Sequence, residues 1–373
     1  AALVPLALDP SFVVALRTQA YSCLFPMMLL LGAMLLLRDW ESKPRPALRL
    51  VASGLLFGLS VFSYFIFAFF FPALVWLFLT GRTQNARRDL GFAALWLFAC
   101  LAGYLPVIGG LFRVSQALGS FEAMLRWLHG HSDSLHPLGD AGSAMDRVRT
   151  MSVVARGVLT GRWPWLMVLQ HHAGDFTGSL KAALLVLVPV GTLIIAQAMP
   201  RDDRRAIATP LVFVVSFLAC AAVFGNRLDG HHYTTIVPFL YAAFGAACAA
   251  WWTRPRETAT ARVAAASGFA LLAVVAVMNT FNLAHFHRDL EASGGAAMYS
   301  DAIDRFAHRV ARDDPDATAY FPDWGYVMPF VFVTRARLAW LDSVDPDRIA
   351  RESCTGKPQV VVKHVGGKVH EPF

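Results

Sequence analysis

The stretch LVASGLLFGLSVFSYFIFAFFFPALVWLFLT, residues 50–80, contains no charged side chain. A helix crosses the hydrocarbon core of a bilayer with about 20 apolar residues, so this stretch is too long for one span. We therefore expect two short helices that meet near Phe65, with Pro72 tolerated in the second because neighbouring helices satisfy the freed carbonyl. Gly54 and Gly58 have the spacing that lets another helix approach closely. Packing inside the bundle is the simpler explanation for them, and a dimer contact is the alternative.

The composition of the whole chain agrees with a membrane protein. Hydrophobic residues make up 56% of the 373 residues, charged residues make up 16%, and the mean hydropathy is +0.48. Soluble domains carry about 25% charged residues. A soluble protein of this length would form two or three domains, and the chain has too little polar surface to cover them.

Six further apolar runs are long enough to cross a bilayer. They are Tyr21–Leu37, Gly91–Phe112, Leu180–Met199, Ala206–Phe224, His232–Trp252 and Val263–Leu283. With the divided stretch at 50–80, they predict an all-α transmembrane bundle of about eight spans in residues 1–284. The hydropathy falls after Leu283, and residues 285–373 are predicted to form a small soluble α/β domain.

Basic residues gather in four short segments between the apolar runs, at 38–49, 82–88, 201–205 and 254–262. Counting two spans in 50–80 puts all four segments on one side of the membrane, which the positive-inside rule assigns to the cytoplasm. The net charge of +7 therefore reflects topology, and we expect membrane lipids rather than nucleic acid as partners. We predict a multi-pass membrane protein whose C-terminal domain lies on the exoplasmic side.

The long loop at 113–179 and the C-terminal domain both show local structure. Two amphipathic helices are expected in the loop, one with Leu118, Phe121, Leu125 and Leu128 on its apolar face and one with Val148, Met151, Ala155 and Leu159. Trp163 and Trp165 suit the headgroup level of a membrane. In the domain we expect helices at Ala297–Arg312 and Asp347–Glu352, with strands at Ala317–Phe321 and Gln359–Val362.

Asp9 stands in Leu8-Asp9-Pro10 at the exoplasmic mouth of the first span, with Arg17 further along the same helix. An acid at that depth is a functional hypothesis by default. The carboxylate suits a general base, and the guanidinium suits the phosphate of an anionic lipid donor. The alternative is structural, because Asp before Pro is a good helix N-cap.

A second group of candidates crowds a short loop between two spans. Arg227, Asp229, His231, His232 and Tyr233 lie within seven residues, although a short loop needs only turn residues. Arg227 suits phosphate binding, and either histidine suits proton transfer. The alternative is that the histidines and Tyr233 anchor the chain at the membrane interface.

Two further sites are weaker candidates. His171, His172 and Asp175 end the long loop on the same side as the histidine pair. These residues leave a divalent metal open as an alternative, although the sequence implies no cofactor. Asp323-Trp324-Gly325 follows a predicted strand, where α/β folds place functional loops; a capping turn is the alternative.

Three segments resemble the central part of the bacterial GT-C glycosyltransferases. These are Leu8-Asp9-Pro10 with Arg17, the helix end Leu35-Leu36-Leu37-Arg38-Asp39-Trp40, and the run from Ala52 to Ser60. The segment His232–Pro238 is similar to a late helix of the same enzymes, which include the dolichyl-phosphate-mannose mannosyltransferase and aminoarabinose transferase group. The resemblance implies a polyprenyl-phosphate-sugar donor, an exoplasmic site, inversion at the sugar and a catalytic acid in the first exoplasmic loop.

The chain departs from this family in two places. The leading helices and the first loop of the family would lie upstream of Ala1, so we expect the chain to lack them together with the usual catalytic acid. Asp9 matches a later acidic position. The Thr-Lys pair that follows the Gly-Leu helix in the family is replaced here by Ser63-Tyr64.

The resemblance also implies a bacterial inner membrane, with the C-terminal domain on its periplasmic or extracellular side. The function that it implies is the transfer of a sugar from a lipid-linked donor to an envelope glycan or lipid acceptor. Asp9 would be a base or donor-positioning acid, and His231 or His232 would move a proton or contact the acceptor. Arg17 and Arg227 would contact phosphate, with Asp229 and Tyr233 beside them in the substrate site. One alternative is a non-catalytic assembly or scaffold subunit. A transporter is the other, and it is disfavoured because we find no internal repeat and almost no charge inside the spans.

Overall fold

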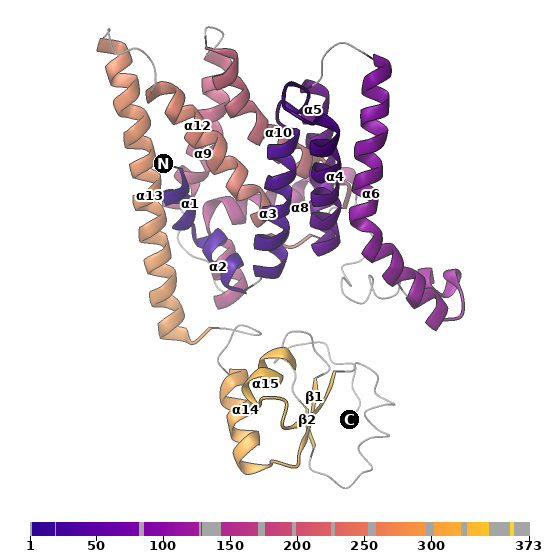
Figure 1. Cartoon of the computed structure of the whole chain (residues 1–373). Helices are drawn as coiled ribbons and strands as arrows, with labels where there is room; N and C mark the ends of the chain where they lie inside the picture. Colours follow the sequence, from indigo (N-terminus) through magenta and orange to yellow (C-terminus); the bar gives the residue numbers. More distant parts are fainter. Residues whose placement is uncertain are drawn as a thin grey trace. The chain divides into compact units, whose positions relative to one another are not determined.

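The computed structural model describes residues 2–18, 20–81, 86–126, 128, 143–170, 176–195, 199–224, 228–252, 259–295, 302–321, 327–342 and 359–361 (Figure 1). The chain divides into two compact units. The first unit, which we call the helical bundle, is Ala1–Trp163 with Asp175–Leu283. The second unit is Pro164–Gly174 with Ala284–Phe373.

The helical bundle is built from long apolar helices and short connecting helices. These are α1 (Leu3–Ala7), α2 (Pro10–Thr18), α3 (Ala20–Leu37), η1 (Trp40–Ser42), α4 (Pro46–Ser63), η2 (Phe65–Phe70), α5 (Phe71–Thr80), α6 (Ala86–Ala117), α8 (Ala144–Thr160), α9 (Phe176–Ile195), α10 (Arg201–Phe224), α11 (Gly230–Tyr233), η6 (Thr234–Ile236), α12 (Val237–Trp252) and α13 (Ala259–Ser293). The last of these helices, α13, continues from the bundle into the second unit.

Six helical segments of the described chain are long and apolar enough to cross a membrane. They are Pro46–Ser63, Asp89–Ala117, Thr177–Ile195, Arg201–Val223, Gly230–Trp252 and Arg262–Ser293. The chain is therefore a multi-helix membrane protein by length and composition. Two shorter apolar segments, Leu24–Leu37 and Phe65–Thr80, would raise the number of spans to the predicted eight, which stays a prediction.

The stretch at 50–80 is divided as expected. Helix α4 ends at Ser63, and Tyr64 adopts an extended backbone with φ −158° and ψ 114°. The chain then forms η2 before α5 begins at Phe71. Pro72 lies in the first turn of α5, where a missing backbone N–H costs nothing. Its position at a helix start, rather than help from neighbouring helices, explains why this proline is tolerated.

Gly54 and Gly58 are used for packing inside the chain. A Cβ atom added to Gly58 would lie 2.2 Å from the carbonyl oxygen of Cys100, and one added to Gly54 would lie 2.6 Å from that of Trp96. Helices α4 and α6 therefore approach each other closely at these glycines, as in other small-residue helix contacts. Gly103 of α6 is equally close to the backbone of α4, with an added Cβ atom 2.5 Å from the carbonyl oxygen of Leu55.

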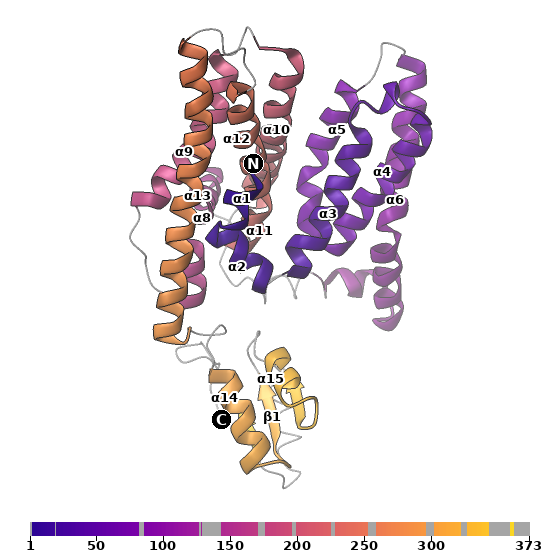
Figure 2. The same ribbon diagram turned by 60° about the vertical axis from the view of Figure 1, so that its left-hand side comes forward.

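The basic residues lie at one end of the helical bundle. Helices α3, α5, α9 and α12 end there, and α4, α6, α10 and α13 begin there (top of Figures 1 and 2). We call this the arginine end, after its described basic residues Arg38, Lys43, Arg45, Arg49, Arg201, Arg204, Arg205 and Arg262. Helices α2 and α11 lie toward the opposite end (Figure 2). The cytoplasmic assignment of the arginine end stays a prediction.

The long loop between α6 and α9 agrees with expectation in part. Helix α6 continues to Ala117, past the predicted end at Phe112. Helix α8 matches the second predicted amphipathic helix and begins with a capping box in which Ser143 and Asp146 exchange hydrogen bonds. Trp163 and Trp165 are both buried by their neighbours in the fold, and their expected place at headgroup level stays a prediction.

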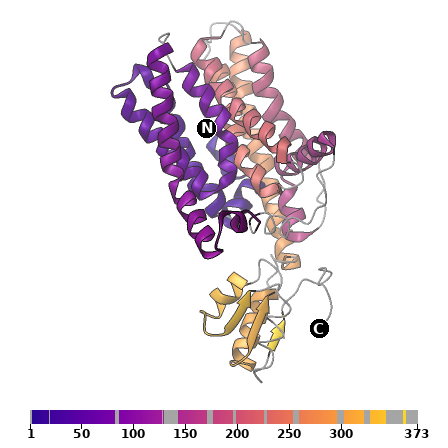
Figure 3. The same ribbon diagram turned by 90° about the vertical axis from the view of Figure 1, so that its right-hand side faces the viewer.

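The second unit contains a small parallel sheet of three strands. Besides the end of α13, its elements are η3 (Trp165–Leu169), α14 (Ala302–Asp313), β1 (Thr318–Phe321), α15 (Val327–Val333), β2 (Ala339–Asp342) and β3 (Gln359–Val361). The strand order is β2-β1-β3, and Thr318 pairs with Ala339 on one side and Gln359 on the other. Ile303 and Val310 of α14 share a core with Phe321 and Phe330. Figure 3 shows the ribbon of this unit in orange and yellow.

Both predicted strands are confirmed, and the described part of the predicted helix at 297–312 is α14. Helix α15 and strand β2 were not predicted. Strand β2 is only four residues long and carries the exposed Trp340, so it lacks the buried, alternating pattern that marks a strand. The helix predicted at 347–352 lies outside the described residues.

Candidate functional site

Asp9 lies at the start of α2 and is buried, with only 1% of its surface exposed. Its Oδ1 atom accepts a hydrogen bond from the backbone N–H of Phe12 at 3.1 Å. This is the bond by which an acidic residue caps the first turn of a helix. The capping role, the structural alternative for Asp9, is therefore present in the fold.

The other carboxylate oxygen of Asp9 meets two side chains from distant helices. Lys181 of α9 donates to Oδ2 at 2.8 Å, and the Tyr241 hydroxyl of α12 donates to the same atom at 2.9 Å. The side chain of Lys181 is 0% exposed. Asn279 of α13 extends the network, since its Nδ2 donates to the Tyr241 hydroxyl and to the backbone carbonyl of Pro5, both at 2.6 Å.

We call Asp9, Lys181, Tyr241 and Asn279 the Asp9 network. It joins the N-terminal segment to three helices of the bundle, α9, α12 and α13. Removing one partner of a buried ion pair leaves an uncompensated charge, which costs about 3–5 kcal/mol. The network therefore fixes the position of α2. For Asp9 to act as a base, a substrate would have to reach a carboxylate that Lys181 already neutralises.

Further contacts hold α2 and α9 against α8. Ser11 donates from its hydroxyl to the backbone carbonyl of Val158 at 2.8 Å. A Cβ atom on Gly178 would lie 2.3 Å from the carbonyl oxygen of Thr160, so the start of α9 packs closely on the end of α8. Helix α2 also contacts η6, the segment that directly follows α11. The two predicted groups of site residues therefore lie on neighbouring elements.

Asp229, His231 and His232 form a compact group around the short helix α11. The Asp229 carboxylate accepts a hydrogen bond from the backbone N–H of Gly230 at 2.5 Å and caps this helix. The Nδ1 atom of His231 lies 3.5 Å from Asp229 Oδ2, and the two imidazole rings are 3.9 Å apart. We call Asp229, His231 and His232, with the stacked Tyr64, the histidine cluster.

The two histidines have different surroundings. His232 is buried and stacks on Tyr64, with ring centroids 5.8 Å apart and an interplanar angle of 4°. Its Nδ1 lies 3.0 Å from the backbone nitrogen of Asp229 and 3.2 Å from the carbonyl oxygen of the same residue, so this ring nitrogen is held by the N-cap backbone. His231 remains 21% exposed, so it is the histidine that a substrate can reach.

The electrostatics of the cluster favour an ionised Asp229. Asp229 stays 65% exposed. Partial desolvation raises the pKa of this carboxyl, but the neighbouring His231 imidazole and the hydrogen bond from the Gly230 N–H outweigh that effect and lower its pKa below the ordinary value of 3.8. A carboxylate beside an imidazole stabilises the protonated ring. Asp229 and His231 therefore lie side by side, the arrangement that a paired carboxylate and imidazole need.

The remaining predicted site residues do not gather here. Arg17 is exposed in the last turn of α2, and in the described part of the chain it forms no ion pair. Tyr233 is buried, packs edge-on against Phe217, and its hydroxyl has no hydrogen-bond partner among the described residues. Arg227 lies outside the described residues.

The metal alternative is not decided by the fold. Among the residues with described placement, no three His, Cys, Asp or Glu side chains come together in a group suited to a metal ion. His171, His172 and Asp175, on which that alternative depends, lie outside this part, and so do Asp323, Trp324 and Gly325.

Three residues of the Asp9 network were not predicted from the sequence: Lys181, Tyr241 and Asn279. Lys181 is the single charge in the Thr177–Ile195 span, and Asn279 is a polar residue inside the Arg262–Ser293 span. Polar and ionisable residues within spans are expensive to bury and usually pair with one another. That rule could have singled out Lys181 and Asn279, although it could not have chosen Asp9 as their partner.

Comparison of the chain with protein families, with curated proteins and with solved structures found no match. Sequence and structure together show a multi-helix membrane protein with six candidate spans and a small C-terminal unit that contains a parallel sheet.

Proposed function

We propose that the protein is a GT-C-like membrane glycosyltransferase. It would move a sugar from a polyprenyl-phosphate donor to an envelope glycan or lipid acceptor, on the side of the membrane opposite the arginine end. The observation that carries this proposal is the histidine cluster, in which the partly exposed His231 lies beside the carboxylate of Asp229. The sequence resemblance described above supplies the donor class.

Sugar transfer from a lipid phosphate has two chemical requirements. A base must take the proton of the acceptor hydroxyl as its oxygen attacks the sugar C1, and the C1–O bond then breaks with its electron pair leaving on the phosphate. In this proposal His231 takes the proton and Asp229 stabilises the resulting imidazolium. Arg17 and Arg227 would neutralise the phosphate.

In this proposal Asp9 is a positioning residue for α2. Through Lys181 and Tyr241 it fixes the start of α2, the helix that carries Arg17 in its last turn. Tyr64 and Tyr233 would border the acceptor side of the cluster. Each of these roles is part of the proposal.

The experiment is a transfer assay with the full protein purified from its native membrane and reconstituted in proteoliposomes. The donors are a panel of radiolabelled polyprenyl-phosphate hexoses and pentoses, and labelled glycan or lipid is measured. We expect His231→Ala to lower the rate about 100-fold or more, the usual contribution of general base catalysis. The matched control is His308→Ala, an exposed histidine of α14 outside the cluster, which should leave the rate unchanged.

A non-catalytic assembly subunit is the second candidate. It is favoured by the pairing of Asp9 with Lys181, which neutralises the one acid that the N-terminal segment brings into the bundle. Absence of transfer by the wild-type protein with every donor would support this candidate. Transfer that survives both His231→Ala and His232→Ala would remove the histidine cluster from the mechanism.

A further inference from the structure

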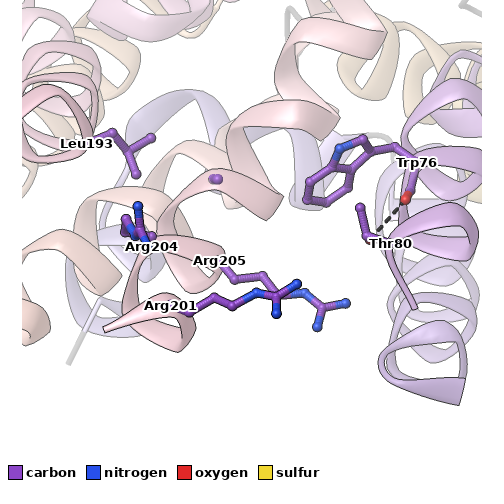
Figure 4. Close-up of a pocket in the computed structure, with 7 residues that line it drawn as sticks. Trp76, Thr80, Leu193, Arg201, Arg204 and Arg205 are labelled. Atoms are coloured by element: carbon purple, nitrogen blue, oxygen red, sulfur yellow. Dashed lines mark hydrogen bonds between the residues drawn. The ribbon is translucent and has the colours of Figure 1, made fainter. Parts of the chain in front are cut away.

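A cavity of about 350 Å³ opens at the arginine end of the bundle, between α5, α9 and α10. It is lined by Trp76, Thr80, Leu193, Arg201, Arg204, Arg205 and Ala208, most of which are labelled in Figure 4. We call it the arginine pocket. Its position at the far end from the histidine cluster makes it independent of the proposed transferase site.

The pocket concentrates positive charge. Arg204 and Arg205 follow Arg201 by three and four residues in the first turns of α10, so each lies beside Arg201 on the helix surface. Like charges at this spacing repel each other. No carboxylate of the described residues lines the pocket, so the lining itself offers no compensating charge.

The three guanidinium groups are only partly used by the fold. Arg205 pairs with Asp39 through Nη1, while its Nη2 atom is buried without a hydrogen-bond partner in the described part of the chain. Arg201 and Arg204 are exposed, and among the described residues neither forms an ion pair. Several donors are therefore available at one cavity.

The positive-inside rule explains why arginines gather at this end of the bundle, but it does not explain why three of them line one cavity. Basic residues that only orient a membrane protein need no common face and no hollow. Arg262, at the same end of the bundle, is exposed and lines neither of the two cavities found there. The three arginines of α10 differ from it because they share a cavity.

One wall of the pocket is apolar. Trp76, Leu193 and Ala208 contribute to it, and the hydroxyl of Thr80 is already engaged by the carbonyl of Trp76 at 2.9 Å (dashed in Figure 4). The next residues of α9, Ile194 and Ile195, are strongly exposed. A ligand here would meet cations on one side and apolar surface on the other, which is the character of a lipid with an anionic headgroup.

We propose that the arginine pocket binds the phosphate of an anionic membrane lipid. Guanidinium groups bind phosphate oxygens through paired hydrogen bonds, and basic pockets between transmembrane helices bind anionic headgroups. The phosphate would satisfy the free donors and relieve the repulsion between the arginines. The acyl chains would lie along Leu193 and the exposed isoleucines that follow it.

The test is lipid binding to the delipidated full protein in neutral detergent, followed by native mass spectrometry. Phosphatidylglycerol and phosphatidylcholine are titrated separately. We expect Arg201→Gln with Arg204→Gln to weaken phosphatidylglycerol binding about 10-fold or more, because hydrogen bonds to charged groups are lost. The matched control, Arg45→Gln with Arg262→Gln, removes the same charge from the same end and should stay within about twofold of the wild type.

A second variant changes the volume of the cavity and leaves its charge unchanged. Ala208→Leu keeps all three arginines but fills part of the pocket, and it should also weaken phosphatidylglycerol binding. The melting temperature of each variant confirms that it is folded. Equal weakening in the two double variants, or equal binding of phosphatidylcholine by the wild type, would overturn the proposal in favour of diffuse attraction.

Inorganic phosphate distinguishes the two sources of the ligand. If it fails to displace phosphatidylglycerol at millimolar concentration, the lipid is the ligand. If it binds the wild type alone, displaces the lipid completely and loses binding in Arg201→Gln with Arg204→Gln, the pocket takes free phosphate and the lipid assignment is wrong.

Discussion

The charged side chains of the Asp9 network and those of the arginine pocket lie in opposite environments. Lys181 and Asp9 are fully buried and lie 2.8 Å apart, so each neutralises the other. Arg201 and Arg204 are exposed, share a helix face and have no acidic residue in the pocket that they line. A buried pair leaves little for a ligand to bind, whereas converging exposed cations leave donors free. Burial and pairing therefore separate charges that support the fold from charges that can bind.

Removal of Lys181 should have the largest effect on stability. We expect Lys181→Met to lower the free energy of unfolding by about 3–5 kcal/mol, because Asp9 is left buried without its counter-charge. Titration with sodium dodecyl sulfate in mixed micelles measures this loss. The double variant Asp9→Leu with Lys181→Leu should recover most of it, because apolar replacements remove both charges. If Lys181→Met were as stable as the wild type, the buried pair would not support the fold, and the contrast with the arginine pocket would be wrong.

The Tyr241 hydroxyl should contribute less. We expect Tyr241→Phe to cost about 1–3 kcal/mol, because the Asn279 amide and Asp9 each lose a buried hydrogen bond. The same titration measures the change. Tyr104→Phe is the control, since the Tyr104 hydroxyl forms no hydrogen bond within the described residues, and it should change stability by less than about 0.5 kcal/mol. Equal effects in the two variants would remove Tyr241 from the network.

Asp229 offers a test of the histidine cluster with a pH dependence. We expect Asp229→Ala to cost about 1 kcal/mol at neutral pH, the usual value of a lost N-cap. The folded pKa of Asp229 lies below its ordinary value, so the ionised carboxylate stabilises the fold above pH about 4, and this contribution falls as the pH drops through the lowered pKa. The difference between wild type and Asp229→Ala should therefore shrink as the pH falls below about 4. A difference that grows in acid would contradict this assignment.

The pocket arginines should have the smallest effect on stability. In lipid-free detergent, Arg201→Gln with Arg204→Gln should change the free energy of unfolding by no more than about 0.5 kcal/mol, because the side chains are exposed and repel each other. A loss of more than about 1 kcal/mol would show that these charges support the fold, and the contrast with the Asp9 network would disappear.

Several features of the fold followed from local sequence. The break in residues 50–80 was predicted near Phe65 and lies at Tyr64, because the length of an apolar run limits how it spans a bilayer. The strand at Thr318–Phe321 was recognised by its buried residues. Strand β2 was missed because it is short and exposes Trp340.

The candidate site was predicted in part. The local grouping of Asp229, His231 and His232 follows from their positions in one short loop, and the structure adds that His232 is buried on Tyr64 while His231 remains accessible. Asp9 was singled out by its sequence, but its surroundings were not predictable. The headgroup-level position of Trp163 stays a prediction, and the structure adds that its indole packs on Gly230, where an added Cβ atom would lie 2.0 Å away.

The sequence by itself determined the membrane class, the apolar helices and the grouping of basic residues between them, because hydropathy and charge act over neighbouring residues. Only the tertiary structure decided which buried polar groups meet. Asp9 and Lys181 are 172 residues apart, and Asp9 and Tyr241 are 232 residues apart. Their contact depends on how four helical segments pack, and it persists because a buried charge is stable only beside its partner.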